Sequence, residues 1–338
     1  MYIIRPIREA DLDAYEEFSK TSSLGLINLP HNRAILKDKI KSSITAFNTP
    51  VLKPYLENYT FVLENRATGE LGGTCGIASR MGVSEPHYYY KLETVVNELT
   101  KREMQILTPV CYPIGPTEIC ALYLKPDFRK EGLGKLLSLC RFLFIACHRE
   151  RFEEEVVAEM RGYITEESVV PFWEALGKKF LNISYHKLCE MELESRSFIP
   201  SILPRWPLYT ALLPPEAQAC IGKTHDKTVP ALKLLYNQGF TFTGEIDPFD
   251  GGPKISCKTN EIKTIQECRT SIVDKIESIS HQSRQYLISN KMIDFRVCYG
   301  DVHFLENNLV SISSDTAENL NIHVGDSISY VKVPSLKE

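Results

Sequence analysis

Apolar residues between positions 118 and 147 change from a strand pattern to a helix pattern. Residues 118–124 (EICALYL) form a short segment that is rich in apolar and β-favouring side chains. Pro126 follows soon after and cannot continue a hydrogen-bonded ladder. From Leu133 to Cys147 apolar residues recur at positions i, i+3, i+4 and i+7, which is the spacing of one helical face. Residues 129–134 (RKEGLG) separate the two patterns. We therefore predict a buried strand, a glycine-containing turn and a long helix, in this order.

Flanking segments show the same patterns at shorter length. The β-type runs 60–64 and 70–78 surround a short loop that contains glycine, which predicts a β-hairpin. Residues 156–162 form another strand, and a right-handed crossover through the long helix would place it parallel to residues 118–124. Further strands are predicted at residues 2–5 and from Tyr88 onward, and further helices at residues 12–20 and 33–43. This mixture predicts an α+β protein with a mixed sheet flanked by helices.

Composition divides the chain into three predicted segments. Residues 1–200 contain the strand, turn and helix unit. Residues 201–254 begin with a proline-rich stretch, and residues 230–240 repeat the helix-and-turn pattern of residues 169–180, which indicates a partial internal repeat. In residues 255–338 short β-type runs are separated by Gly, Asp and Asn turns. We predict that this last segment is a small β-rich, barrel-like C-terminal module.

Composition and charge also narrow the functional class. The 338 residues are 43% hydrophobic and 24% charged, as in an ordinary globular protein. The net charge of −4, with both signs interspersed, is not the basic footprint of a nucleic-acid-binding protein. No run approaches the ~20 apolar residues of a membrane helix and the N-terminus lacks a signal-peptide core, so a cytoplasmic location is expected. The 10 cysteines form no C-x-x-C pair, which predicts reduced core residues and no metal site.

The turn at residues 129–134 has the chemistry of an anion site. Its two glycines let the backbone approach a ligand closely, and the first N–H groups of the following helix favour negative charge. A P-loop and a dinucleotide fingerprint both fail, because Arg129, Leu136 and Leu137 stand where those motifs need glycine, a hydroxyl residue and glycine. The pattern Arg-x-x-Gly-x-Gly resembles the coenzyme A pyrophosphate loop of the GCN5-related N-acyltransferases. The alternative is an ordinary glycine turn, but the strand before it and the helix after it favour coenzyme A.

Several segments, spread over nearly the whole chain, resemble the bacterial arginine N-succinyltransferase family. They are Gly25-Leu26 with Leu29-Pro30, Glu118-Ile119-Cys120, residues 129–134, residues 156–162 (VVAEMRG), Pro171-Phe172-Trp173 and residues 249–253 (FDGGP). The resemblance implies direct attack of the α-amine of L-arginine on succinyl-CoA, with ornithine as a second amine and paired subunits in some members. Leu133, where relatives often carry asparagine, and a divergent tail leave the acyl group and the amine open.

The same resemblance implies how the chain is divided and what it binds. Residues 1–200 would be the acyl-CoA-binding core, and residues 201–254 would complete the active site. Succinyl-CoA would be a co-substrate, with no permanently bound cofactor, no metal, no nucleic-acid partner and no membrane partner. The candidate assemblies are a homo-oligomer and a paired subunit. The residues expected to contact coenzyme A are Leu122, Leu124, Arg129, Lys130, Gly132, Leu133 and Gly134.

The departing thiolate of coenzyme A needs a proton donor. Many relatives of the wider superfamily use a tyrosine where this chain has Trp173, and an indole has no proton to give at a useful pKa. His225 matches the residue that the succinyltransferase family uses as proton donor, and histidine titrates near neutral pH. The alternative interpretation of His225 is a surface histidine before a helix.

Bound arginine would need carboxylates for its guanidinium and a cation for its α-carboxylate. Glu118, Glu159 and Asp250 are candidates for the first role, and Arg161 for the second. Glu159 could instead pair with Arg161, and Asp250 could only cap the turn at Gly251. Two other interpretations stay open: an acyltransferase of this fold with another acyl-CoA or amine, and a non-catalytic acyl-CoA-binding subunit.

Overall fold

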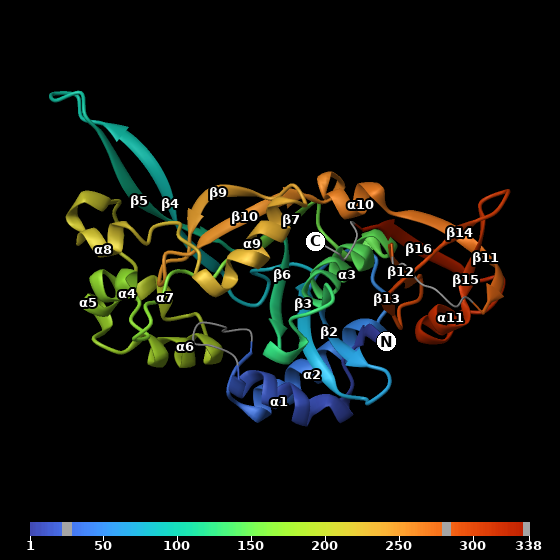
Figure 1. Ribbon diagram of the computed structural model, residues 1–338. Coiled ribbons are helices and arrows are strands. Elements are labelled where there is room, and N and C mark those ends of the chain that lie inside the picture. Colours follow the sequence, from blue (N-terminus) through green and yellow to red (C-terminus); the bar gives the residue numbers. More distant parts are fainter. Residues whose placement is uncertain (22–28, 279–284, 334–338) are drawn as a thin grey trace.

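The computed structural model describes residues 1–21, 29–278 and 285–333 (Figure 1). Gly25 and Leu26, two of the residues that carry the family resemblance, lie outside these ranges. Within them the strands join into one 16-stranded mixed sheet. In sheet order the strands are β14 (His303–Phe304), β15 (Leu309–Ser313), β11 (Arg269–Glu277), β16 (Ser327–Lys332), β12 (Tyr286–Asn290), β13 (Val297–Gly300), β1 (Tyr2–Pro6), β2 (Asn58–Asn65), β3 (Leu71–Ala78), β6 (Thr117–Leu124), β7 (Glu155–Glu159), β10 (Pro253–Lys258), β9 (Thr241–Ile246), β4 (His87–Val96), β5 (Glu103–Tyr112) and β8 (Leu208–Tyr209).

Helices flank this sheet, as predicted, so the α+β class is confirmed. They are α1 (Leu12–Thr21), α2 (Arg33–Asn48), α3 (Leu133–Cys147), α4 (Pro171–Ala175), α5 (Gly177–Leu181), α6 (Tyr185–Glu194), α7 (Ile199–Ile202), α8 (Pro215–Gln218), α9 (Val229–Tyr236), α10 (Lys263–Glu267) and α11 (Ser314–Leu320). Short 3-10 turns lie at Glu9–Asp11, Pro126–Phe128, Arg149–Arg151, Thr210–Leu212, Asp226–Thr228 and Thr259–Glu261. Among the described residues, no helix is long and apolar enough to cross a membrane.

The central unit is β6, α3 and β7. β6 and β7 are parallel neighbours, paired at Thr117 with Val156 and at Glu118 with Val157, and α3 connects them. This confirms the predicted βαβ crossover. β7 is shorter than predicted and ends at Glu159, although the next residue, Met160, still donates its N–H to Pro253 at the start of β10.

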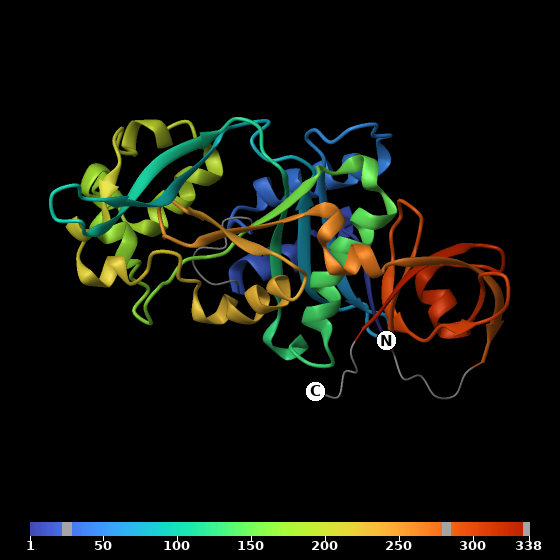
Figure 2. The ribbon, with the colours of Figure 1, turned by 90° about the horizontal axis from the view of Figure 1, so that it is seen from above.

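The predicted hairpin is also confirmed, as β2 and β3. A second hairpin, β4 and β5, is longer and projects from the body of the molecule (Figure 1). Only the beginning of its first strand was predicted, from Tyr88. Below this arm the short helices α4 to α8 gather at one end of the molecule, and the C-terminal strands lie at the other end (Figures 1 and 2).

The C-terminal region is β-rich, as predicted, and its strands curl around α11, which contacts β11, β13 and β15 (Figure 2). β13 joins this module to the central sheet by pairing with β1, Val297 opposite Ile4. The predicted boundary at residue 255 falls inside β10, which pairs with β7 and β9 of the central sheet. The boundary at residue 200 falls inside α7. We therefore place the start of the module after α10, and the three-part division otherwise stays an interpretation.

Helix α3 is buried along most of its length. The ring of Phe144 lies 5.0 Å from Tyr59, 5.2 Å from Phe61 and 5.0 Å from Phe295, measured between centroids. Phe295 precedes β13, so this aromatic cluster joins the central sheet, α3 and the C-terminal module. Such contacts add to the free energy gained by burying the rings. They fix the C-terminal half of α3 against the central sheet and the C-terminal module.

Candidate active site

The strands β6 and β7 separate immediately after their paired residues. β6 remains bonded to β3 as far as Leu124, opposite Gly73, whereas β7 pairs with β10 as far as Glu159. A bulge in β6 at Ala121, with φ of 51°, accompanies this separation and shifts the register against β3. Extra twist and redirected side chains are the usual effect of a bulge. The result is a wedge in the sheet between β6 and β7.

The glycine-containing turn lies at the same end of β6 as this wedge. Glu131 and Gly132 both have left-handed backbones, with φ of 52° and 71°, so the chain reverses sharply before α3 begins at Leu133. The first N–H groups of a helix of this length lack intrahelical acceptors and attract anions. Tyr299 of the C-terminal module donates a hydrogen bond of 3.0 Å to the carbonyl of Gly132. The module therefore fixes the shape of the predicted coenzyme A loop.

The residues predicted to contact coenzyme A all lie along this path, but in different environments. Leu133 is buried in the core, so only its backbone faces a ligand. Leu122 and Leu124 are half-buried and pack against the same core. Arg129 and Lys130 are exposed, and Arg129 Nε donates a hydrogen bond of 3.3 Å to the carbonyl of Leu124. The structure brings these residues together, while their contacts with coenzyme A stay a prediction.

The structure around Gly134 leaves room for a side chain at this position. A Cβ added there would meet only Leu124 Cδ2, at 3.7 Å, which is an ordinary van der Waals distance. Packing therefore does not require glycine at this position. The glycine is consistent with the prediction that a ligand closely approaches the helix start, which stays a prediction.

Two carboxylates lie where the wedge opens, one on each strand. Glu159 accepts a hydrogen bond from the Tyr89 hydroxyl, and its Oε1 lies 3.3 Å from His87 Nδ1. Although burial alone would raise the pKa of Glu159, His87 and the charge of Arg196 lower it to about 2. Burial and the neighbouring charge of Glu159 raise the pKa of Glu118 to about 7. One carboxylate is thus held ionised, and the other can exchange a proton near neutral pH.

Asp250 stabilises the turn around Gly251, which is the alternative role considered for it in the sequence analysis. Its oxygens accept backbone hydrogen bonds from Gly162 at 2.7 Å and from Gly252 at 2.8 Å. These bonds tie the segment after β7 to the turn before β10. Arg161, in that segment, is half-buried, and burial lowers its pKa. Asp250 therefore positions this segment, and its direct contact with arginine stays a prediction.

His225 lies beside Arg161. Its backbone N–H donates to the Arg161 carbonyl at 2.9 Å, and a β-bridge joins Thr224 to Gly162. The ring Nδ1 accepts a hydrogen bond of 3.1 Å from the N–H of Lys227, so the neutral ring carries its hydrogen on Nε2. Burial, and next the charge of Arg161, lower the pKa of His225 below its ordinary value of 6.5. The half-buried ring is therefore mainly neutral at pH 7. Trp173, by contrast, is fully buried and donates to the carbonyl of Ile183.

Several charged residues near Glu159 were missed by the sequence analysis. Glu192 lies near the end of α6 and Arg196 just after it, and the two form an ion pair with 3.7 Å between Glu192 Oε1 and Arg196 Nε. Asp247, in the turn between β9 and β10, accepts the N–H groups of Phe249 and Asp250. His87 and Tyr89 share one strand face, a period-two signal that could have been seen in the sequence. Arg196 and Asp247 had no such signal, because only the tertiary fold brings them to β7.

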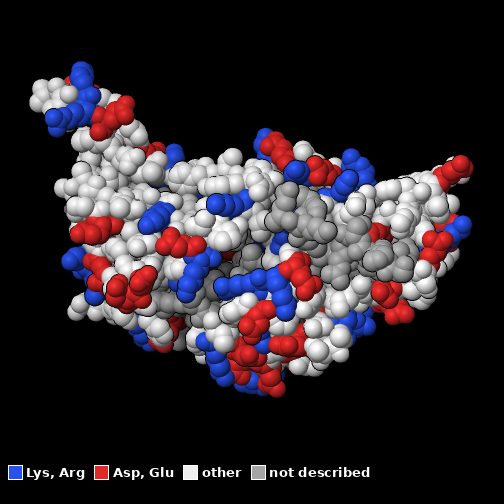
Figure 3. All heavy atoms as spheres, in the orientation of Figure 1, with Lys and Arg blue, Asp and Glu red and all other residues white. Residues whose placement is uncertain are grey.

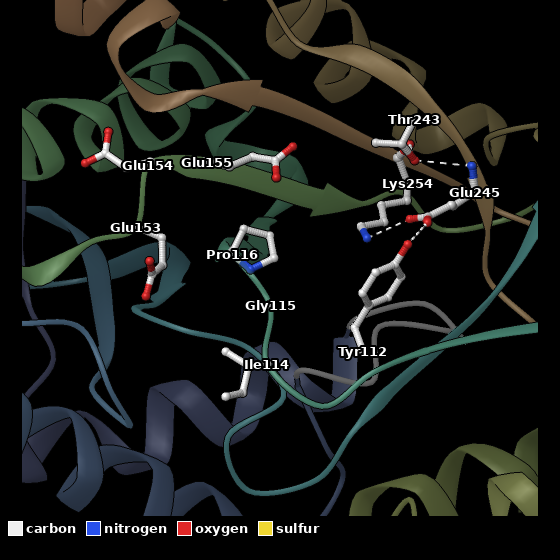
Figure 4. Close-up of a pocket in the computed structure, with 10 residues that line it drawn as sticks. All are labelled: Tyr112, Ile114, Gly115, Pro116, Glu153, Glu154, Glu155, Thr243, Glu245 and Lys254. Atoms are coloured by element: carbon white, nitrogen blue, oxygen red, sulfur yellow. Dashed lines mark hydrogen bonds and ion pairs between the residues drawn. The ribbon is translucent and has the colours of Figure 1, made fainter.

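A separate depression of about 490 Å³ lies at the opposite end of β6 and β7 (Figure 4). Its residues are Tyr112, Ile114, Gly115, Pro116, Glu153, Glu154, Glu155, Thr243, Glu245 and Lys254. Its charged groups are largely satisfied by one another or by neighbours. Lys254 Nζ lies 2.7 Å from Glu245 Oε2 and 4.2 Å from the centre of the Tyr89 ring, and Glu153 pairs with Arg80. This depression therefore lacks the features of the wedge.

Across residues 1–21, 29–278 and 285–333, no group of three or more His, Cys, Asp or Glu side chains is placed to hold a metal ion. On the face shown in Figure 3, basic and acidic side chains are interspersed.

A strand pair that parts beside a glycine turn at a helix start is typical of an acyl-CoA-dependent acyltransferase. Comparison with known proteins identifies the family. The family model described as the arginine N-succinyltransferase beta subunit matches residues 2–264, and the model of its C-terminal domain matches residues 268–332. The chain belongs to the arginine N-succinyltransferase family, and it is an acyltransferase.

Individual relatives agree with this assignment. Arginine N-succinyltransferase of Escherichia coli is 33% identical over 98% of this chain and 98% of its own. The enzyme of the same name from Salmonella schwarzengrund is 38% identical over 80% of this chain and 79% of its own. A solved structure, arginine/ornithine succinyltransferase subunit AI from Pseudomonas aeruginosa, is 32% identical with a TM-score of 0.89 and covers 99% of both chains. The resemblance predicted from the sequence is thereby confirmed.

The loop assignment can be tested at Gly134. We expect Gly134→Val to lose binding of coenzyme A while the protein stays folded, because the larger side chain displaces the pyrophosphate from the helix start without entering the core. Isothermal titration calorimetry with coenzyme A measures this. Ala146→Val, near the other end of α3, is the matched control and should bind as the wild type does. Unchanged affinity in Gly134→Val would disprove the assignment.

Proposed function

We propose that this protein transfers the succinyl group of succinyl-CoA to the α-amine of L-arginine. The observation that carries the proposal is the wedge between β6 and β7, open beside an anion-binding helix start and bordered by Glu118 and Glu159. The names of relatives that match nearly the full chain supply the acyl group and the amine. Ornithine is a second candidate amine, because the Pseudomonas aeruginosa relative is named for both.

Coenzyme A would lie with its pyrophosphate at the first turn of α3 and its pantetheine arm in the wedge. The arm carries amide groups, and the separated edges of β6 and β7 offer backbone partners for them. The thioester carbonyl would then lie near the bulge at Ala121, where backbone N–H groups can stabilise the oxyanion. Leu122 and Leu124 border this path, and Arg129 and Lys130 would contact the phosphates.

The attacking amine must first lose a proton, and Glu118 is suited to take it. The carboxylate faces Glu159, Arg196 and Lys39, and it titrates near neutral pH because it is buried beside another carboxylate. A base with a pKa near the working pH combines a useful deprotonated fraction with a useful proton affinity. The proton passes from the α-ammonium to Glu118, and the free amine attacks the thioester carbon.

The tetrahedral adduct then collapses, the carbon–sulfur bond breaks, and coenzyme A leaves as a thiolate that takes up one proton. His225 would serve this step as a hydrogen-bond donor to the departing sulfur through its Nε2–H, because Nδ1 is held by the N–H of Lys227. A neutral imidazole kept so by its surroundings is an effective donor to developing negative charge. The proton that sulfur receives is the second proton of the attacking nitrogen, and the imidazole stays neutral throughout. Trp173, buried and bonded to Ile183, has no part in this step.

The activity itself is tested by product analysis. Incubation with succinyl-CoA and L-arginine, without added metal, should yield a product heavier than arginine by one succinyl group, located on the α-nitrogen by fragmentation in the mass spectrometer. Acetyl-CoA in place of succinyl-CoA is the control. Acetyl transfer without succinyl transfer would reduce the proposal to an acyltransferase with another donor.

His225→Ala should lower kcat by about 10²–10⁴, the range for loss of a positioned proton donor, with little change in the affinity for either substrate. Because the interaction forms mainly in the transition state, kcat and kcat/KM should fall together. Steady-state kinetics measures both. His186→Ala, on the exposed face of α6, is the matched control and should keep its rate. If His225→Ala also keeps most of its turnover, His225 has no catalytic role.

The role of Glu118 predicts a pH dependence. Since the base must be deprotonated in the free enzyme, log(kcat/KM) should rise with pH up to about 7 and level off above it. Glu118→Gln cannot accept the proton, so its rate should be lower by about 10²–10⁴ and should not rise through this window. A pH profile of both proteins measures the effect. A rising limb near pH 7 that persists in Glu118→Gln would assign that limb to another group.

A further inference from the structure

A small cavity adjoins the wedge on the side away from α3. It lies where α6, β4 and the turn between β9 and β10 meet. The residues that line it are His87, Tyr88, Glu159, Glu192, Arg196, Ile199, Asp247, Pro248 and Phe249. Glu159 belongs to both the wedge and this cavity, so a small molecule could occupy the two at once.

Three carboxylates face this cavity, and one guanidinium among its lining residues opposes them. Burial, and next the charges of Glu159 and Asp250, raise the pKa of Glu192 to about 7 in spite of Arg196. Burial together with Asp250 and Glu192 raises the pKa of Asp247 as well. At Glu192 and Asp247, burial and the neighbouring carboxylates therefore outweigh the stabilisation of negative charge by nearby cations. A further or better-placed cation would be stabilised among them.

Glu192 is the carboxylate with the most to gain from a ligand. Its side chain is only 4% exposed, and Arg196 Nε lies 3.7 Å from its Oε1, beyond hydrogen-bonding distance. A buried carboxylate that lacks a hydrogen-bonded cation raises the free energy of the folded protein unless a ligand supplies that cation. The guanidinium of Arg196 is instead directed to His87, whose Nδ1 lies 2.7 Å from Nη1. Arg196 therefore does not bind Glu192 through two parallel hydrogen bonds.

Arg196 is the side chain that can give way. It is 24% exposed, against 4% for Glu192, so it lies on the solvent side of the pair. The cavity has room for about one water molecule, about 10 Å³, so a larger group can enter only when Arg196 moves outward. A ligand with a guanidinium and a carboxylate could take over both interactions. Its guanidinium would replace that of Arg196 beside Glu192, and its carboxylate would be a new anionic partner for Arg196.

We propose that Glu192, together with Asp247 and Glu159, forms the subsite for the guanidinium of L-arginine, and that Arg196 occupies this subsite until the substrate displaces it. The inference rests on the proposed function and adds the residues that select the amine. A planar guanidinium can bind carboxylates by two parallel hydrogen bonds, which an ammonium or a neutral urea group cannot reproduce. The α-amine would then point into the wedge, toward Glu118.

The first test compares L-arginine with L-citrulline, which has a neutral urea group in place of the guanidinium. The wild type should prefer arginine, in kcat/KM, by about 10³ or more, because a buried polar site rejects a ligand that leaves it unpaired. Glu192→Gln should reduce this preference about 10- to 100-fold, the value of a charge-assisted hydrogen bond. Glu190→Gln, exposed on the same helix and paired with Lys187, is the matched control and should retain it. Retention of the full preference by Glu192→Gln would overturn the assignment.

The second test does not depend on the folding of Glu192→Gln or on turnover. Propylguanidinium, which lacks both amine and carboxylate, should bind Arg196→Gln about 10-fold more tightly than it binds the wild type, because no resident guanidinium competes with it. Neutral propylurea should bind the two proteins alike. Equal or weaker binding of propylguanidinium by Arg196→Gln would contradict the proposal. If the wild type fails to acylate arginine while this binding result holds, the proposed function fails and the cation subsite stands.

Discussion

The separation of β6 from β7 is the constraint on which the rest of the site depends. Two parallel strands that stayed paired would use their backbone groups on each other and leave no entry for a thioester. The bulge at Ala121 and the competing pairing of β7 with β10 keep the strands apart after Glu118. The same geometry brings one carboxylate from each strand to the opening. A closed sheet with the same side chains would have neither the wedge nor the two carboxylates at its opening.

The energetic cost of this arrangement is a group of buried acids that the chain only partly neutralises. Burial opposes ionisation of Glu118, Glu192 and Asp247, while Glu159 is kept ionised by His87 and Arg196. Removing a partner from such a group costs free energy, and supplying one recovers it. A cationic amino acid is the kind of substrate that an under-compensated acidic cluster favours. Catalysis and substrate selection thus derive from a single feature, the placement of carboxylates around the end of β7.

The sequence predicted those parts that depend on local periodicity. The helical spacing from Leu133 to Cys147, with the strand before it, was enough for the βαβ unit, and glycine-containing loops were enough for the β2–β3 hairpin. The residues of the coenzyme A loop and the position of His225 came from motif resemblance. The family assignment based on it is confirmed, while the roles of the individual residues stay predictions.

Other parts could not be predicted because they depend on tertiary contacts. The length of the β4–β5 arm, the continuation of the central sheet through β10 and the meeting of Arg196 with Glu159 leave no periodic signal. Asp250 shows the limit most clearly. Its sequence context allowed a ligand or a turn cap, and only the tertiary fold reveals its bonds to Gly162 and Gly252.

The most direct measurement is a crystal structure with a non-reactive thioether analogue of succinyl-CoA and L-arginine bound together. The account predicts the pyrophosphate at the first turn of α3 and the acyl carbonyl between β6 and β7. It also predicts the α-nitrogen of arginine within about 2.6–3.2 Å of Glu118, directly or through one water molecule. An acyl chain bound away from the wedge, or an α-nitrogen out of reach of Glu118, would contradict it.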